Sequence, residues 1–306
     1  MTLPTSITVR SYSGVADLDA IDSMTAQLAH ALHRIDLPWR LASPATFDPA
    51  NIRLWESHSG QLVGWAILQF PWHCLDYEIL PGPHRESVEQ DVLIWATDRL
   101  TRETTRRGTP LPFYVSARSD DPSRIAAVHR AGFKSAGWSY VHMARDLREP
   151  FDTPDMPTGF RIRPLAGEEE VPAYVMAHRA AFGSMNMTTD WRCRTLRYPR
   201  YLADLDLVAE APDGSVAAFC VGWLLQTAGG GHVAQVEPLG VCPEYQRLGL
   251  GRALLTNMFQ RAREHGATRI EVNAESYNVA SRGLYEAAGF SAQTELQFAL
   301  RSFCPV

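Results

Sequence analysis

The pattern of apolar and polar residues changes period within residues 233–266. Residues 233–241 form a nearly continuous apolar run, which predicts a buried strand. Beyond a polar connection, apolar side chains recur at helical spacing until His265-Gly266: Leu254, Leu255, Met258, Phe259 and Ala262. This spacing predicts an amphipathic helix that ends at the glycine. The chain therefore predicts a strand, a turn and a helix in that order.

The turn carries two glycines in the segment Gln246-Arg247-Leu248-Gly249-Leu250-Gly251-Arg252. Glycine lets the backbone approach a ligand closely, and the first turn of a helix has unpaired amides and a partial positive charge. We therefore expect a diphosphate to bind here. A nucleotide P-loop is excluded because Arg252-Ala253 replace the required Lys and Ser or Thr. A dinucleotide fingerprint is disfavoured because Leu254 replaces its third small residue.

A second segment, about 30 residues downstream, contains Asn278, Tyr285 and the turn Ala288-Gly289-Phe290. With the Gln-x-x-Gly-x-Gly pattern of Gln246 to Gly251, it resembles the GCN5-related N-acetyltransferase family. The resemblance implies an acyl-CoA N-acyltransferase fold, which is a mixed α/β, mostly antiparallel sheet flanked by helices. It also implies acetyl-CoA as co-substrate.

The two halves of the chain resemble each other at domain length. Opening strands at 7–10 and 160–163, central strands at 63–66 and 221–224, and Ala-Gly-Phe turns at 131–133 and 288–290 are offset by 153, 158 and 157 residues. We therefore expect tandem domains at 1–150 and 160–306, joined by a proline-rich linker at 151–159. This organisation is similar to that of duplicated family members such as mycothiol synthase.

The N-terminal half departs from the family pattern. Aligning Leu80 with Val241 places Arg85 opposite Gln246, and Val88 and Gln90 opposite the two glycines. Aligning the Gly-Phe turns places Asp121 opposite Asn278 and Val128 opposite Tyr285. We therefore expect a degenerate N-terminal domain and one acetyl-CoA site, in residues 160–306.

The resemblance also implies catalytic roles. Glu237 is the candidate base for an amine whose pKa is near 10, and the alternative is a carboxylate that faces solvent or pairs with an Arg. Gln235, where some family members carry the base, cannot accept a proton. Tyr285 would donate its proton to the CoA thiolate, and its alternative is a core aromatic residue.

Other residues would hold the co-substrate. A backbone N–H among Leu239, Gly240 and Val241 would meet the thioester oxyanion. Asn278 would hold the pantetheine arm or, alternatively, cap a helix. Arg247 and Arg252 would add charge at the diphosphate or face solvent. We expect the backbone amides of residues 246–252 to bind more strongly than either arginine.

Three further features have ordinary interpretations. Cys242 is interpreted as a small apolar filler rather than a nucleophile, because no His and carboxylate are placed beside it. His178 lies on a predicted helix near the acceptor loop, and a surface position is at least as well supported. The loop at 183–199 contains Met185, Met187, Trp191 and Tyr198, which suit either an acceptor pocket or an interdomain seam.

Composition limits the partners. A chain of 306 residues with 29 basic and 34 acidic side chains has no basic run, which argues against nucleic acid. Five cysteines without paired spacing favour a reducing cytoplasm, and the ten histidines show no metal spacing. The polar N-terminus and the short apolar run at 216–225 predict no membrane association.

The sequence thus predicts a cytoplasmic N-acetyltransferase that acts on a small-molecule amine by direct transfer in a ternary complex, without a metal. The alternatives are a non-catalytic acyl-CoA sensor or scaffold, and an acetyltransferase for protein N-termini or lysines. The acceptor and the oligomeric state stay open.

Overall fold

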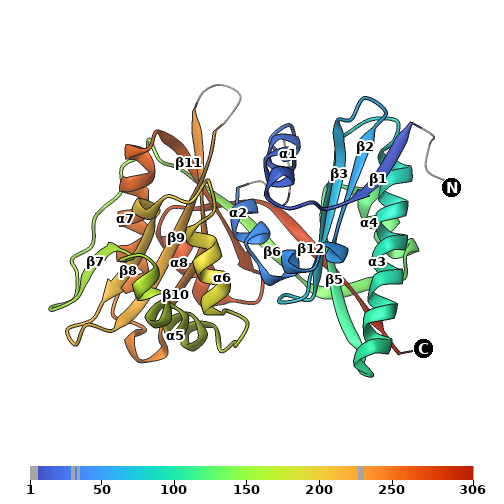
Figure 1. Ribbon diagram of the computed structural model, residues 1–306. Helices are drawn as coiled ribbons and strands as arrows, with labels where there is room; N and C mark the ends of the chain where they lie inside the picture. The colour runs from blue at the N-terminus through green and yellow to red at the C-terminus, as the bar shows by residue number, and fades with distance from the viewer. Residues whose placement is uncertain (1–5, 29–31, 33–34, 227–230, 306) are drawn as a thin grey trace. The chain divides into compact units, whose positions relative to one another are not determined.

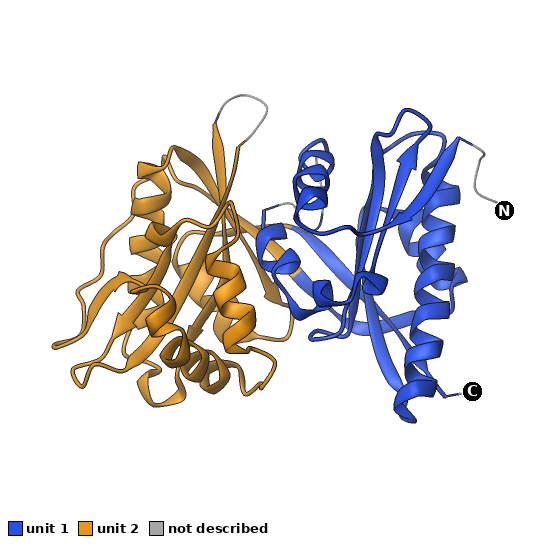
Figure 2. Ribbon diagram, viewed as in Figure 1, with its two compact units in different colours: residues 1–140, 294–306 blue, residues 141–293 orange. Residues whose placement is uncertain are grey.

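The computed structural model describes residues 6–28, 32, 35–226 and 231–305 (Figure 1). The chain divides into two compact units (Figure 2). Unit 1 contains residues 1–140 and 294–306, and unit 2 contains residues 141–293.

The same order of elements occurs twice along the chain. The first series is β1 (Ile7–Ser11), α1 (Val15–Thr25), α2 (Leu37–Leu41), β2 (Ile52–Ser57), β3 (Leu62–Gln69), β4 (Cys74–Ile79), α3 (Arg85–Arg107), β5 (Leu111–Arg118), α4 (Pro122–Arg130) and β6 (Lys134–Asp146). The second is β7 (Arg161–Pro164), α5 (Val171–Phe182), α6 (Thr189–Leu196), β8 (Asp206–Glu210), β9 (Val216–Gln226), β10 (His232–Val241), α7 (Leu250–Glu264), β11 (Ala267–Glu275), α8 (Val279–Ala287) and β12 (Ser291–Phe303). Short 3₁₀ turns are η1 (Pro44–Phe47), η2 (Pro49–Asn51), η3 (Glu168–Glu170), η4 (Ala203–Leu205) and η5 (Pro243–Tyr245). The repeated order agrees with the predicted duplication.

The sheets are mixed and mostly antiparallel, as predicted. Strand order is β1-β2-β3-β4-β5-β12-β6 in unit 1 and β6-β11-β10-β9-β8-β7 in unit 2, with β6 and β12 divided between the units. The pairs β4·β5 and β10·β11 are parallel. In unit 1, α3 and α4 lie on one face of the sheet and α1 and α2 on the other (Figure 1).

The last strand of the second series completes the sheet of the first. Residues Leu296 to Phe303 of β12 pair antiparallel with β5, and Ala299 and Phe303 are buried in the unit 1 core. The compact units therefore differ from the expected halves at 1–150 and 160–306, because β12 leaves its own repeat. The domain boundaries expected from the sequence repeat therefore stay a prediction.

The core of unit 2 lies between α7 and its sheet. Leu254, Met258 and Phe259 are at most 1% exposed. Gly222 of β9 makes room for this helix, since a Cβ there would lie 2.4 Å from Met258 Sδ. The segment predicted as a linker contributes Phe151, whose ring centroid lies 5.4 Å from that of Phe259. The linker segment has no regular structure but is anchored to unit 2.

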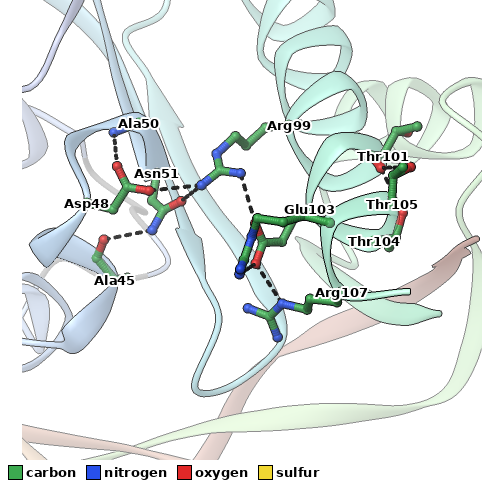
Figure 3. Close-up of polar contacts among 11 residues, drawn as sticks. Ala45, Asp48, Ala50, Asn51, Arg99, Thr101, Glu103, Thr104, Thr105 and Arg107 are labelled. Atoms are coloured by element: carbon green, nitrogen blue, oxygen red, sulfur yellow. Dashed lines mark hydrogen bonds and ion pairs between the residues drawn. The ribbon is translucent and has the colours of Figure 1, made fainter. Parts of the chain in front are cut away.

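A polar network fixes α3 in unit 1 (Figure 3). Arg99 donates hydrogen bonds to Asp48 (2.9 Å) and Asn51 (3.0 Å), which lie before β2. Glu103, one turn along α3, accepts hydrogen bonds from Arg99, Arg106 and Arg107. These arginines lower the pKa of the Glu103 carboxyl to about 2, the Arg106 hydrogen bond contributing most, although burial opposes them.

Candidate active site

The parallel strands β10 and β11 pair over only part of their length. His232 to Gln235 pair with Ala267 to Glu271, and the pairing ends there, although β10 continues to Val241 and β11 to Glu275. We call the place where this pairing ends the fork of unit 2. On its other side, β10 stays paired with β9, except for a register shift between Val236 and Leu239.

Glu237 lies in that register shift, immediately after the fork. Its backbone carbonyl accepts a hydrogen bond from Trp223 Nε1 (2.7 Å), and the residue is half-buried. Its carboxylate is close enough to Tyr285 of α8 to raise the pKa of that phenol. The two predicted catalytic residues, which are 48 positions apart in the sequence, therefore influence each other electrostatically, and their catalytic roles stay predictions.

Tyr285 is 5% exposed. Burial raises the pKa of its phenol well above the ordinary value, and the neighbouring Cys220 and Glu237 raise it further. A hydrogen bond with the Ser281 side chain has a smaller, opposite effect. Tyr285 is thus protonated at neutral pH and able to donate a hydrogen bond.

Asn278 caps α8. Its Oδ1 accepts a hydrogen bond from the Ser281 amide (3.0 Å), and its Nδ2 donates one to Glu275 (3.2 Å). The helix-capping alternative considered for this residue is therefore observed. A contact with pantetheine stays a prediction, because both ends of the amide already have partners within the chain. The cap fixes the start of the helix that carries Tyr285.

The predicted glycine turn begins α7. Gly249 is the N-cap in a left-handed conformation (φ 85°), and Arg247 also has positive φ (64°). A glycine cap has no side chain to bond the amides of the first turn, which have no intrahelical acceptor. Gly251 packs against α8, since a Cβ there would lie 3.2 Å from Leu284. Gln246, Arg247, Leu248 and Arg252 are exposed around this turn, whereas Leu250 is buried.

This helix start has the properties that a diphosphate requires, namely amide donors, a positive helix end and little steric bulk. The residues present therefore fit the anionic part of acetyl-CoA. The two exposed arginines add positive charge nearby.

The amide directions of β10 identify candidate oxyanion donors. Cys242 N donates to Ala217 O of the β9 side (2.9 Å). Because successive amides of a strand alternate in direction, the Gly240 amide points to the same side. The amides of Leu239 and Val241 point the other way, towards the fork. Of the three predicted donors, these two are oriented suitably.

Tyr174 of α5 is a second buried phenol whose pKa Glu237 influences. This residue is completely buried, and its pKa is raised by burial and by charges that include Glu237. The Arg192 guanidinium lies 3.8 Å from the centre of its ring and pairs with the buried Asp206. The chain gives no signal for Tyr174, because it lies 63 residues before Glu237 and outside any motif.

The surface position considered for His178 is wrong. His178 is 9% exposed and its ring stacks on Phe219 (5.4 Å between centroids). Burial, assisted by Arg192 and Arg179, lowers its pKa to about 4, so the ring is neutral at physiological pH. Phe219 in turn lies against Gly240, where a Cβ would approach it to 2.4 Å.

The predicted loop at 183–199 contains the helix α6 (Thr189–Leu196). Met187, Trp191 and Tyr198 are buried, whereas Met185 is 71% exposed. Three of these four side chains are therefore buried. Cys242 is 3% exposed and donates weak hydrogen bonds to two carbonyls at 3.6 Å. Burial raises its pKa to about 11, which agrees with the interpretation as a filler.

The sequence alignment placed Val88 and Gln90 opposite the two glycines of the unit 2 turn, and this placement is wrong. In unit 1, α3 begins at Arg85 with His84 as N-cap, so Val88 and Gln90 lie inside the helix rather than opposite Gly249 and Gly251. The connection from β4 to α3 is shorter than that from β10 to α7, and the alignment did not allow for this difference.

Fold and fork together place the chain among acyl-CoA-dependent acyltransferases. Residues 176–290 match the acetyltransferase (GNAT) family. The chain belongs to this family and is an acetyl-CoA-dependent N-acetyltransferase.

Relatives extend the similarity over most of the chain. Mycothiol acetyltransferase of Nocardiopsis dassonvillei is 27% identical over 272 residues, which cover 82% of this chain and 74% of that protein. Mycothiol acetyltransferase of Stackebrandtia nassauensis is 26% identical over 258 residues, covering 82% of each chain.

Solved structures share the fold over nearly the whole chain. A GCN5-related N-acetyltransferase from Sphaerobacter thermophilus has a TM-score of 0.67 at 22% identity, covering 99% of this chain and 98% of that one. A tandem GNAT protein from the clavulanic acid biosynthesis pathway has a TM-score of 0.65 at 15% identity, covering 98% and 99%. None of the helices in the described residues is long and apolar enough to cross a membrane.

Proposed function

We propose that unit 2 transfers acetyl from acetyl-CoA directly to the primary amine of a small molecule, within a ternary complex. One observation carries this proposal. A half-buried carboxylate, Glu237, follows directly after the point where the strands β10 and β11 part, and its charge helps to raise the pKa of the buried phenol Tyr285. In unit 1, Val128 stands at the position equivalent to Tyr285.

Glu237 acts as the base. An alkylammonium group has a pKa near 10 and must lose a proton before it attacks the thioester. The carboxylate accepts this proton directly or through a water. As the tetrahedral intermediate forms, the amides of Leu239 and Val241 stabilise its oxyanion.

Tyr285 stabilises the leaving thiolate. A thiol has a pKa near 8.5, below the raised pKa of this phenol. Complete proton transfer from Tyr285 to the thiolate is therefore unfavourable. Tyr285 instead donates a hydrogen bond to the sulfur as the bond to the acyl carbon breaks, and the thiolate takes the proton that the amine nitrogen of the tetrahedral intermediate releases, which differs from the full proton transfer from Tyr285 expected from the sequence.

The acceptor is proposed from the relatives. Two of them are mycothiol acetyltransferases, and we propose a small amine of that chemical class, a cysteinyl sugar, as the first acceptor to test. A cytoplasmic site of action, where acetyl-CoA is available, belongs to the same proposal.

The test is release of CoA thiol from acetyl-CoA with cysteinyl sugars, aminoglycosides, amino acids, polyamines and a lysine-containing peptide. We expect turnover with one small amine, and a fall in kcat/KM of about 100-fold or more in Glu237→Gln. Glu244→Gln, an exposed carboxylate in η5, is the matched control and should keep full activity. Turnover only with the peptide would contradict the small-molecule acceptor, and no turnover with saturable acetyl-CoA binding would favour a binding protein.

A further inference from the structure

Unit 1 has a fork of its own, at the equivalent pair of strands. β4 and β5 are parallel and pair only at Cys74↔Tyr114 and Leu75↔Val115. Beyond these residues, the backbone amides and carbonyls of the two strands no longer bond each other. In unit 1 an arginine side chain takes their place.

Arg124 of α4 bridges the parted strands. Its Nη1 donates to the carbonyl of Tyr77 on β4, and its Nε donates to the carbonyl of Ser116 on β5, each at 3.1 Å. Its guanidinium carbon lies 3.7 Å from the centre of the Tyr77 ring, and Glu78 lies 3.8 Å from Nη1. Arg124 is only 6% exposed. The guanidinium thus fills the fork of unit 1 and is held there by both strands.

The equivalent residue of unit 2 is Ser281. The amide of Arg124 donates to the N-cap Asp121 at 3.0 Å, and the amide of Ser281 donates to the N-cap Asn278 at 3.0 Å. The ends of the two helices also match, since Phe133 N bonds Val128 O and Phe290 N bonds Tyr285 O. All these pairs are 157 residues apart. The same helix position therefore carries a long cation in one unit and a short hydroxyl in the other.

The surroundings of Arg124 are also closed to an acyl-CoA. Arg85, the first residue of α3, forms an ion pair with Asp121 at 2.5 Å. The Asp121 carboxylate therefore already offsets the positive charge at the start of α3. The remaining cavity has a volume of about 350 Å³ and is lined by Arg85, Arg118, Arg124 and four carboxylates. The three arginines are paired with Asp121, Asp120 and Glu78. The fourth carboxylate, Glu89, is in excess of these pairs and disfavours a diphosphate.

We propose that Arg124 excludes the pantetheine arm of acyl-CoA from the fork of unit 1, and that Ser281 leaves the fork of unit 2 open. One helix position then decides which half of the chain binds acyl-CoA. Pantetheine carries amide groups that need strand partners, and in unit 1 those partners already bond a buried guanidinium. This inference rests on the proposed function of unit 2.

The test places the arginine of unit 1 in unit 2. Binding of acetyl-CoA to the full chain is measured by calorimetry for wild type, Ser281→Arg and Ala287→Arg. Ala287 is exposed near the end of the same helix, so Ala287→Arg adds the same charge outside the fork. We expect one site in wild type and in Ala287→Arg, and binding weakened about 100-fold or more in Ser281→Arg.

Each outcome separates the inference from the proposed function. Two sites in wild type, or one site of unchanged affinity in Ser281→Arg, would overturn the role of Arg124 while leaving unit 2 as an acetyl-CoA site. No binding in wild type would overturn the proposed function, and the inference with it. If Ser281→Arg does not fold, as judged by circular dichroism and Tm, Ser281→Gln replaces it, and unchanged affinity in that variant would equally overturn the inference.

Discussion

At the scale of single residues, burial decides what the reactive side chains can do. Tyr285 and Cys242 both have raised pKa values because they are removed from water, and His178 has a lowered one for the same reason. At neutral pH these three groups are an uncharged phenol, thiol and imidazole. Glu237 is only half-buried and therefore keeps more contact with water than these three groups.

Exchange of Tyr285 for Phe should lower kcat by about 10- to 100-fold, because a hydrogen bond to the developing thiolate is lost in the transition state. The Kd of acetyl-CoA should change little, since the phenol acts on the leaving sulfur. Steady-state kinetics and calorimetry measure the two effects. Tyr277→Phe, in the exposed turn before α8, is the control and should leave both unchanged. Equal loss of kcat in the two variants would contradict the role of Tyr285.

The sequence was informative about residues that belong to local motifs and uninformative about the others. Glu237, Tyr285 and the glycine turn were singled out because they lie in motifs that resemble those of a known family. Asp121 and Val128 were aligned correctly, as the matching helix caps show. Val88 and Gln90 were misaligned because loop length cannot be read from spacing alone.

At the scale of elements, helix α3 depends on one carboxylate. Glu103 has a side-chain exposure of 6% and bonds three arginines. Its folded pKa is about 2, against 4.5 for an ordinary glutamate. A depressed pKa stabilises the folded state above the unfolded pKa, and this stabilisation disappears as the pH falls from about 4.5 towards 2.

Glu103→Gln should therefore lower the free energy of unfolding by about 1–2 kcal/mol at pH 7, with a smaller loss at pH 3. The value is modest because Arg106 is 71% exposed and water screens its charge. Urea unfolding at the two pH values measures it. Asp98→Asn, an exposed position on α3, should show no such pH dependence. A loss that is equal at pH 7 and pH 3 would show that the ionised form is not what matters.

Elements with a clear apolar period and a clear end signal were predictable from the sequence. The strand at 233–241 and the helix ending at His265-Gly266 were located almost to the residue. The helix α6 was not, because its apolar residues lie among polar ones and its buried Arg192 hides the apolar face. A buried ion pair such as Arg192–Asp206 has no signature in hydrophobic periodicity.

At the scale of the whole molecule, the two compact units do not correspond to two continuous halves of the sequence. β5 takes its partner from residues 296–303, so residues 1–150 lack a strand of their own sheet. Nothing in apolar periodicity distinguishes a strand that stays in its repeat from one that leaves it. The exchange of β12 was therefore beyond sequence reasoning.

A fragment of residues 1–150 should not fold alone, because the edge of β5 would be unpaired and the buried Phe303 would be missing from its core. Circular dichroism and thermal melting should show no cooperative transition. Joining residues 294–306 to this fragment through a flexible linker should restore one. A cooperative melt for residues 1–150 alone would show that β12 is dispensable for unit 1.

The pairing of β5 with β12 also determines when the sheet of unit 1 can be completed during synthesis. Arg118 of β5 precedes its partner Leu296 by 178 residues, which a ribosome adding about 5–20 residues per second needs roughly 9–36 s to translate. Throughout that interval the earlier half of the protein exists with an open sheet edge, while residues 141–293 are completed behind it. Unit 1, although most of it is translated first, can therefore complete its sheet only at the end of synthesis. During this interval a chaperone that shields strand edges could bind β5.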